Sequence, residues 1–186
     1  MRRGFVVAAL VGAAALASWQ GVSQAEDVDD LFRFSYDEYY RIRGQYLVNI
    51  VYNCGYCHTP LTKDGQLDRS RFLSGHPASS GTAGGVNTSF DTPWGRVFAP
   101  NITPDRETGI GNWDRDTFVR AVTTGIHGKD APERWIYQPM PWLSVRNLPR
   151  DDIEAIWAFL RAVPPVKNKA PAPIPRPKDK PKTGNR

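Results

Sequence analysis

The most regular hydrophobic pattern in the chain lies toward its C-terminal end. Four apolar residues there recur at the spacing of a single helix face: Ile153, Ile156, Trp157 and Leu160. This i, i+3, i+4, i+7 periodicity predicts a helix over residues 149–162. Pro149 suits the first position of such a helix, and the pair of prolines at 164–165 ends the helical segment.

Two further helices are predicted from the residues at their ends. Ser35 and Glu38 form a capping box, which predicts a helix from residue 35 to about residue 52. Asp114 suits the N-terminus of another helix, which Gly125 would end. The intervening residues 59–100 are rich in Gly, Ser, Thr and Pro, so this stretch is predicted to be loop.

The two ends of the chain differ in composition from its middle. Residues 1–25 combine an Arg pair, an apolar run of 13 residues and small residues before Glu26. This pattern indicates a signal peptide and a periplasmic protein. The alternative is an uncleaved membrane anchor, but a membrane-spanning helix needs about 20 apolar residues, so cleavage is favoured. Residues 164–186 contain seven prolines and carry a net charge of +6, which predicts a disordered tail. The folded domain is then 26–163.

Composition narrows the class of function. The 186 residues carry a net charge of +5, yet residues 26–163 carry −3 without a basic stripe, so no nucleic-acid partner is expected. Two cysteines exclude a disulfide-rich scaffold and a four-cysteine zinc module. The 16 Gly and 16 Pro predict much loop and few long regular elements. Together with the helices predicted above, the expected fold is all-α, with a few helices and long loops. Such loops need something to fold around, and a large bound cofactor would supply it.

Both cysteines fall in one motif, Cys54-Gly55-Tyr56-Cys57-His58. This motif is the signature of covalent c-type haem attachment. Thiols three residues apart in a turn at the end of a helix face the same way, so each can add to one haem vinyl group. The next residue, His58, then supplies an axial nitrogen to the iron. One covalently attached haem c uses both thiols of the chain.

Three other interpretations of the motif stay open on the sequence alone. A Cys-x-x-Cys redox pair is typically preceded by a strand, whereas a helix is predicted here, and it leaves His58 unexplained. A zinc site would need more ligands, and only His76 and His127 remain among the histidines. A chance occurrence of the pattern is the third.

Met140 is the candidate for the second axial iron ligand. Apart from Met1 it is the only methionine, and it lies between two prolines whose fixed torsions hold the loop rigid. A thioether is a known axial ligand of haem iron. The alternative role is that Met140 fills a gap in the core. His127 is a rival ligand, and His76, in a Gly-rich stretch, is predicted to lie at the surface.

Other residues have two candidate roles each. The tryptophans Trp113, Trp142 and Trp157 would either exclude water from the haem or pack in the core, and core packing is favoured for Trp157. Asn101 and Thr103 would either hydrogen-bond within the haem pocket or stabilise a turn.

Several motifs follow one another in a distinctive order: 43–47 (Arg-Gly-Gln-Tyr-Leu), 54–59, 93–95, 99–105 (Ala-Pro-Asn-Ile-Thr-Pro-Asp), 108–113, the Pro-Met-Pro loop and 157–166. Over these residues the chain resembles the monohaem domains in the cytochrome c subunits of bacterial membrane-associated alcohol, gluconate and sorbitol dehydrogenases. The resemblance implies a class I cytochrome c fold with His58 and Met140 on the iron. Those subunits string several haem domains together, whereas this chain has one haem motif.

A haem with both axial positions filled implies an electron carrier rather than an enzyme. Single electrons would pass between a periplasmic dehydrogenase and a downstream cytochrome or oxidase. The alternative is a haem-containing oxidoreductase subunit in which Met140 is displaced, and a thiol–disulfide oxidoreductase is a third. The basic tail would hold an acidic partner or an anionic membrane surface, or would be a solvated appendage.

Overall fold

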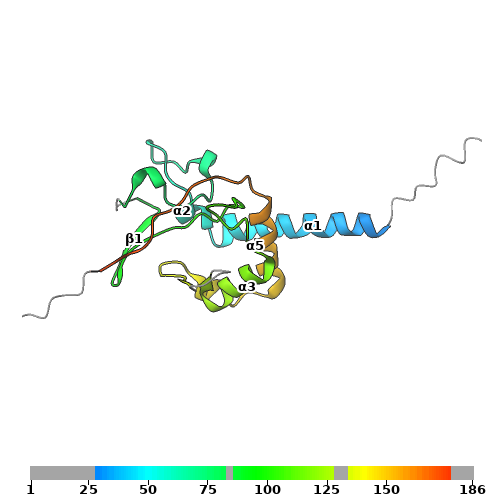
Figure 1. The fold of residues 1–186 in the computed structure, drawn as a ribbon. Coiled ribbons are helices and arrows are strands. Elements are labelled where there is room, and N and C mark those ends of the chain that lie inside the picture. The colour runs from blue at the N-terminus through cyan, green and yellow to red at the C-terminus, as the bar shows by residue number, and fades with distance from the viewer. Residues whose placement is uncertain (1–27, 83–85, 128–133, 177–186) are drawn as a thin grey trace, which may run out of the picture. The chain divides into compact units, whose positions relative to one another are not determined.

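A computed structural model describes residues 28–82, 86–127 and 134–176 (Figure 1). The chain divides into two units, 1–37 and 38–186, and of the first unit the structure describes the beginning of α1. The helices are α1 (Val28–Tyr46), α2 (Cys54–His58), α3 (Arg115–Thr124), α4 (Trp142–Val145) and α5 (Arg150–Ala162), with short helical turns η1 (Leu47–Val51), η2 (Arg69–Arg71) and η3 (Ala78–Ser80). The strands are β1 (Ser89–Thr92), β2 (Gly95–Phe98), β3 (Ile126–His127), β4 (Arg134–Trp135) and β5 (Ile174–Pro175).

The three predicted helices are present, with one boundary in error. α5 begins within a residue of the predicted start. α3 follows Asp114, whose carboxylate caps the first turn at 2.8 Å, and it ends at Gly125, which has a φ of 76°. α1 begins at Val28, however, so the predicted capping box at Ser35 falls inside the helix.

Helices α1 and α5 cross in close contact at Gly44. A Cβ atom at this position would overlap the carbonyl oxygen of Ala155, so the two backbones lie closer than a side chain at residue 44 would allow. Beside the crossing, the Arg43 guanidinium donates to both carboxylate oxygens of Asp152, at 2.7 and 2.9 Å. The missing side chain at Gly44 and the bidentate Arg43–Asp152 ion pair together fix where the two helices meet.

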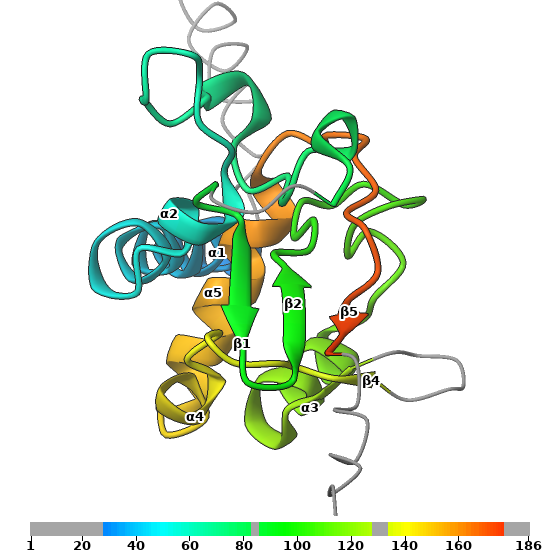
Figure 2. The ribbon, with the colours of Figure 1, turned by 90° about the vertical axis from the view of Figure 1, so that its left-hand side faces the viewer.

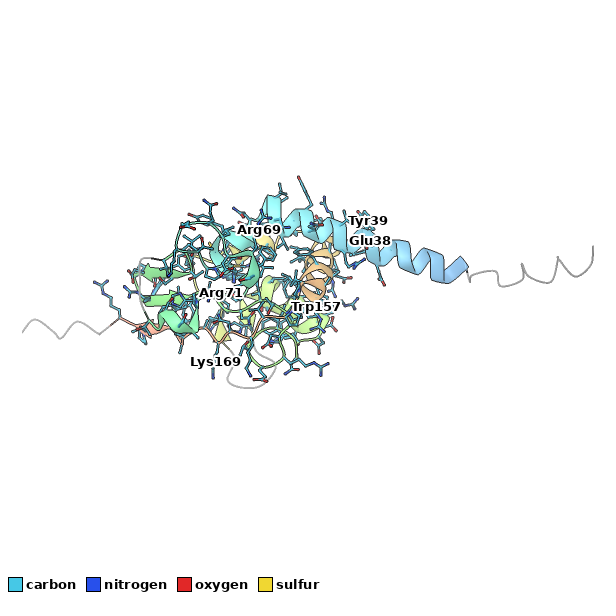
Figure 3. All side chains as sticks on the ribbon, turned by 90° about the horizontal axis from the view of Figure 1, so that it is seen from above. Glu38, Tyr39, Arg69, Arg71, Trp157 and Lys169 are labelled. Atoms are coloured by element: carbon cyan, nitrogen blue, oxygen red, sulfur yellow. The ribbon has the colours of Figure 1, made fainter. Side chains whose placement is uncertain are left out.

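The core lies between α3, α5 and the turn that follows α1. Trp157 of α5, labelled in Figure 3, is half-buried and stacks on Phe118 of α3 with 5.3 Å between ring centroids. Two loop residues, Leu73 and Ile110, are buried in the same core, so the loops take part in the core packing. The buried members are Tyr40, Leu47, Val48, Leu73, Ile110, Phe118, Val119, Val122, Val145, Ile153, Ala155, Ile156, Leu160 and Val163.

Two small sheets accompany the helices, so the prediction of an all-α fold is not confirmed. β1 and β2 form an antiparallel hairpin, and β5 pairs antiparallel with β2, which gives the order β1-β2-β5 (Figure 2). β3 and β4 form a second antiparallel pair. The sequence prediction of loop over 59–100 missed the hairpin, because strands of four residues are too short for their alternation to be recognised.

The chain after α5 is held against the domain as far as residue 176. The Arg176 amide donates to the Trp94 carbonyl at 2.8 Å, and Asn101 Nδ2 donates to the Val166 carbonyl at 2.7 Å. The predicted disordered tail is therefore wrong for residues 164–176. The segment is extended, as its prolines require, but its hydrogen bonds are made to distant loops and leave no mark on local composition.

Two sequence predictions lie outside the described residues: the signal peptide at 1–25 and the last ten residues of the tail. Among the helices that the structure describes, none is both long and apolar enough to cross a membrane.

Candidate functional site

The two cysteines and the histidine after them occupy one short helix, α2. Asn53, which precedes α2, has left-handed torsions (φ 46°, ψ 46°), a conformation that asparagine tolerates better than most residues. Cys54 and Cys57 are three positions apart on this helix, so their side chains lie on the same face. Both thiols are free. The structure therefore has the arrangement that the motif predicts, with two neighbouring thiols and an imidazole directly after them.

The environment of these thiols does not match that of a redox-active pair. Burial raises the pKa of Cys54 to about 11, and burial also raises the pKa of Cys57. Thiol–disulfide oxidoreductases need the opposite, a lowered thiol pKa that supplies a reactive thiolate. A zinc site finds no support either, since no three His, Cys, Asp or Glu side chains are grouped as metal ligands within residues 28–82, 86–127 and 134–176.

His58 is buried, with 6% of its surface exposed, and has a fixed tautomer. Its Nδ1 lies 2.9 Å from the carbonyl oxygen of Pro100. A carbonyl oxygen can only accept a hydrogen bond, so Nδ1 carries the proton and the lone pair lies on Nε2. Burial lowers the pKa of the ring, which favours its neutral form. A neutral imidazole with Nδ1 bound to a carbonyl is the form in which histidine coordinates metals.

A glycine turn holds the backbone around His58. The Gly75 amide donates to the His58 carbonyl oxygen at 2.7 Å, and its φ of 80° favours glycine. A Cβ atom on Gly75 would lie 2.5 Å from the carbonyl carbon of Pro100. Gly75 therefore binds the main chain of His58, and its lack of a side chain leaves room for the Pro100 carbonyl, which binds the His58 ring. Neither Gly75 nor Pro100 was identified from the sequence, because both roles depend on contacts between distant loops.

Asn101 and Thr103 stabilise the loop that carries Pro100. Asn101 Oδ1 accepts hydrogen bonds from the Thr103 amide at 2.9 Å and from the Thr103 hydroxyl at 2.7 Å. This is the turn that was one of the two roles predicted for these residues. Both residues are buried, and Asn101 Nδ2 reaches Thr108 and the segment after α5. The loop is thus fixed from two sides.

His76 is fully buried, so the prediction that it lies at the surface is wrong. Its Nδ1 lies 2.9 Å from the Thr88 hydroxyl, and its ring packs on Phe98 with 4.8 Å between centroids. Burial lowers its pKa and favours the neutral ring. The β1–β2 hairpin covers this Gly-rich stretch, and local composition gives no indication of such a cover.

Met140 lies in the loop between β4 and α4 and is half-buried. Both ends of this loop are held at Gly125. The Ile136 amide donates to the Gly125 carbonyl at 2.7 Å, and the Trp142 ring lies so close that a Cβ on Gly125 would come within 2.7 Å of it. The glycine that ends α3 therefore also closes the loop that carries Met140.

The remaining candidate residues make contacts with aromatic rings or with a guanidinium group. His127 stacks on Trp113, with 6.0 Å between centroids and 29° between ring planes. The Arg146 guanidinium lies 5.9 Å from the centroid of the Trp142 ring. Trp157 belongs to the core through Phe118, which is the role favoured for it from the sequence.

Comparison with known proteins places the chain among c-type cytochromes. No protein-family model matches it. The chain is 33% identical over 174 residues to the cytochrome c subunit of alcohol dehydrogenase (quinone) from Gluconobacter oxydans, which covers 92% of this chain and 30% of that protein. It is 33% identical over 132 residues to the fructose dehydrogenase cytochrome subunit from Gluconobacter japonicus, over 70% of this chain and 22% of that protein. It is also 34% identical over 125 residues to the gluconate 2-dehydrogenase cytochrome c subunit from Pantoea cypripedii, over 67% of this chain and 23% of that protein.

The chain is thus a c-type cytochrome homologue, related to the cytochrome c subunits of alcohol, fructose and gluconate dehydrogenases. The resemblance to the cytochrome c subunits of dehydrogenases, drawn from the sequence motifs, is confirmed, whereas its monohaem detail is not. The chain spans less than a third of the length of the three relatives compared above.

Proposed function

We propose that this chain holds one haem c through Cys54 and Cys57, with His58 and Met140 as the axial ligands, and passes single electrons in the periplasm. The electrons would come from a dehydrogenase and go to a downstream cytochrome or oxidase. The observation that carries the proposal is His58, a buried neutral imidazole of fixed tautomer directly after two cysteines on one short helix. When bound, the haem supplies one-electron redox chemistry.

The residues of α2 fit covalent attachment of such a group. Each thiol would add across one vinyl group to form a carbon–sulfur bond, which uses both cysteines. Gly55, between the two cysteines, packs closely on the Phe72 ring: a Cβ atom on residue 55 would lie only 2.9 Å from it. The turn between the two thiols therefore has a fixed position. The Pro100 carbonyl orients the His58 ring and increases the electron density on its Nε2.

The surroundings of Met140 support its role as the second ligand. The core cluster is formed by other side chains, and Met140 is half-buried in a loop anchored at both ends. A methionine that filled a gap in the core would instead be packed among the buried residues. The Met140 thioether would raise the reduction potential of a haem that His58 also holds, because it favours ferrous iron.

With His58 and Met140 both holding the iron, no position would be open to a substrate, so the chain would transfer electrons rather than act as a catalyst. The names of its relatives, cytochrome c subunits of dehydrogenases, support a dehydrogenase as the electron donor. The export pattern of residues 1–25 supports a periplasmic location, and N-terminal sequencing of the purified protein would find Glu26 first.

A redox titration combined with carbon monoxide binding tests the proposed function. The purified protein is expected to titrate as a single one-electron centre per chain, and its reduced spectrum is expected to stay unchanged under carbon monoxide. Rapid binding of carbon monoxide to the wild-type protein would instead favour the alternative, an oxidoreductase subunit with a displaceable sixth ligand.

Gly125→Ala is expected to weaken the bond between Met140 and the iron. The added methyl group would press on the Trp142 ring and displace one end of the Met140 loop. The measurement is the weak charge-transfer absorption that marks sulfur on ferric haem, which is expected to lose intensity.

Gly65→Ala is the matched control for this variant. Gly65 also has a positive φ, of 78°, but a Cβ there would meet no atom within 4 Å. Both variants therefore carry a similar backbone strain, of about 1–2 kcal/mol. Equal loss of the charge-transfer absorption in the two variants would contradict the role given to Gly125.

The low-spin spectrum is expected to persist on acidification through pH 6.5. Burial lowers the pKa of His58 from its ordinary value of 6.5, and iron at Nε2 would lower it further, since metal and proton compete for this nitrogen. The folded protein then binds fewer protons at this site than the unfolded chain. The lowered pKa of His58 therefore stabilises the folded protein above pH 6.5, and this stabilisation is lost as pH falls through the lower folded-state pKa. An absorption titration that showed conversion to high spin centred at pH 6.5 would contradict it.

A further inference from the structure

Asn168 lies in the extended segment after α5 and uses both ends of its side-chain amide. Its Nδ2 donates to the carbonyl oxygens of Ser74 and His76, at 2.7 and 2.8 Å. Its Oδ1 accepts from the Ala78 amide at 2.9 Å. A single side chain therefore joins the C-terminal segment to three backbone groups of the 74–78 loop.

The main chain of Asn168 binds a second loop. Its amide donates to the Thr108 hydroxyl at 2.9 Å, and its carbonyl oxygen accepts from Asn101 Nδ2 at 3.2 Å. Val166, two residues earlier, also binds this loop: its carbonyl accepts from Asn101 Nδ2 and from the Thr103 hydroxyl, and its amide donates to the same hydroxyl at 3.1 Å. Asn168 thus connects the 74–78 loop with the 101–108 loop.

These two loops contain or directly follow the two backbone groups that hold His58. Gly75, whose amide binds the His58 carbonyl, lies between the two residues that Asn168 contacts through Nδ2. Pro100, whose carbonyl accepts from His58 Nδ1, directly precedes Asn101. The residues just before the second loop also bind the first loop, since the His76 amide donates to the Ala99 carbonyl at 2.8 Å. Asn168 therefore binds residues directly adjacent to Gly75 and to Pro100, whose backbone groups hold His58.

We infer that Asn168 is a positioning residue for the axial histidine, acting through the 74–78 and 101–108 loops on the hydrogen bond between His58 and Pro100. The inference rests on the proposed function, in which His58 coordinates the iron. Loss of the amide would leave the buried carbonyls of Ser74 and His76 without their Asn168 donor and let the loops move apart. The His58 hydrogen bond would lengthen, and its ring would donate less electron density to the iron.

The test is the midpoint potential and the ferric electron paramagnetic resonance spectrum of the full-length, haem-loaded Asn168→Ala variant. A weaker donor disfavours ferric iron, so the potential is expected to become more positive. The expected shift is at most about tenfold in the reduction equilibrium, or about 59 mV for a one-electron couple. The g values of the low-spin signal are expected to change with it.

Lys169→Ala is the matched control, because Lys169, labelled in Figure 3, is the next residue of the same segment and is exposed. It should leave the potential and g values unchanged. If Asn168→Ala does not accumulate with haem, Asn168→Ser gives the same two readouts, with a smaller shift in the same direction.

An Asn168 variant that is less stable but has wild-type potential and g values would overturn the inference, since Asn168 would then only hold the fold together. A colourless wild-type protein would overturn the proposed function, and the inference with it. The two failures are distinguishable because the second is seen in the unmutated chain.

Discussion

The reduced Met140→Ala variant is expected to bind carbon monoxide, in contrast to the wild-type protein. Alanine has no atom that can coordinate iron, so in the proposed site the sixth position would open while Cys54, Cys57 and His58 would still hold the haem. The reduction potential is expected to fall, because the thioether no longer favours ferrous iron. The fall should be a substantial part of the roughly 0.8 V range that axial ligands span. Absorption spectra under carbon monoxide and a redox titration measure the two effects.

Leu143→Ala is the matched control for loss of side-chain volume near this loop. Leu143 lies three residues after Met140 and is exposed, so its truncation removes a similar apolar volume without touching the proposed ligand. It should leave carbon monoxide binding and the potential at wild-type values. A Met140→Ala protein that remained low-spin and unreactive toward carbon monoxide would show that another side chain, such as His127, occupies the sixth position.

Gly44→Val is expected to lower the free energy of unfolding by about 3 kcal/mol or more, at the upper end of the range for overpacked sites. The valine side chain would overlap the Ala155 carbonyl, which belongs to the backbone of α5 and cannot move aside as a side chain can. The helices would have to separate, and the Arg43–Asp152 ion pair beside the crossing would be lost with their contact. For a chain of this size, thermal unfolding of the haem-loaded protein should shift down by about 6–12 °C.

Gln45→Val provides the comparison for this stability loss. Gln45 is the next residue of α1 and is exposed, so the same β-branched side chain costs only its helix propensity, less than about 0.7 kcal/mol. Equal destabilisation by the two substitutions would contradict the close crossing at Gly44.

The sequence predicts well the features that depend on neighbouring residues. The helix over 149–162 follows from its apolar face, and the ends of α3 follow from Asp114 and Gly125. The grouping of Cys54, Cys57 and His58 on one face of a turn follows from their spacing alone. In each case the signal lies within one or two helical turns, so local stereochemistry is sufficient.

The sequence fails where distant segments meet. The Pro100 carbonyl that orients His58 is 42 residues away from it, and no local pattern marks a carbonyl group. His76 was misplaced and the ordered segment 164–176 was missed for the same reason, since both are covered or held by parts of the chain far from them in sequence. The motifs that carry the family resemblance include Asn101 and Thr103, whose structural role becomes visible only when the loop contacts are known.

The most direct test of the central claim is a pyridine haemochrome spectrum of the purified protein, produced together with the c-type cytochrome maturation system. One haem per chain is expected, with the absorption maximum of a haem whose two vinyl groups are both saturated, and it should be retained after acid–acetone extraction. A matched Cys54→Ser/Cys57→Ser variant should lose the haem in that extraction. Colourless wild-type protein, with Cys54 and Cys57 free or joined in a disulfide, would contradict the account.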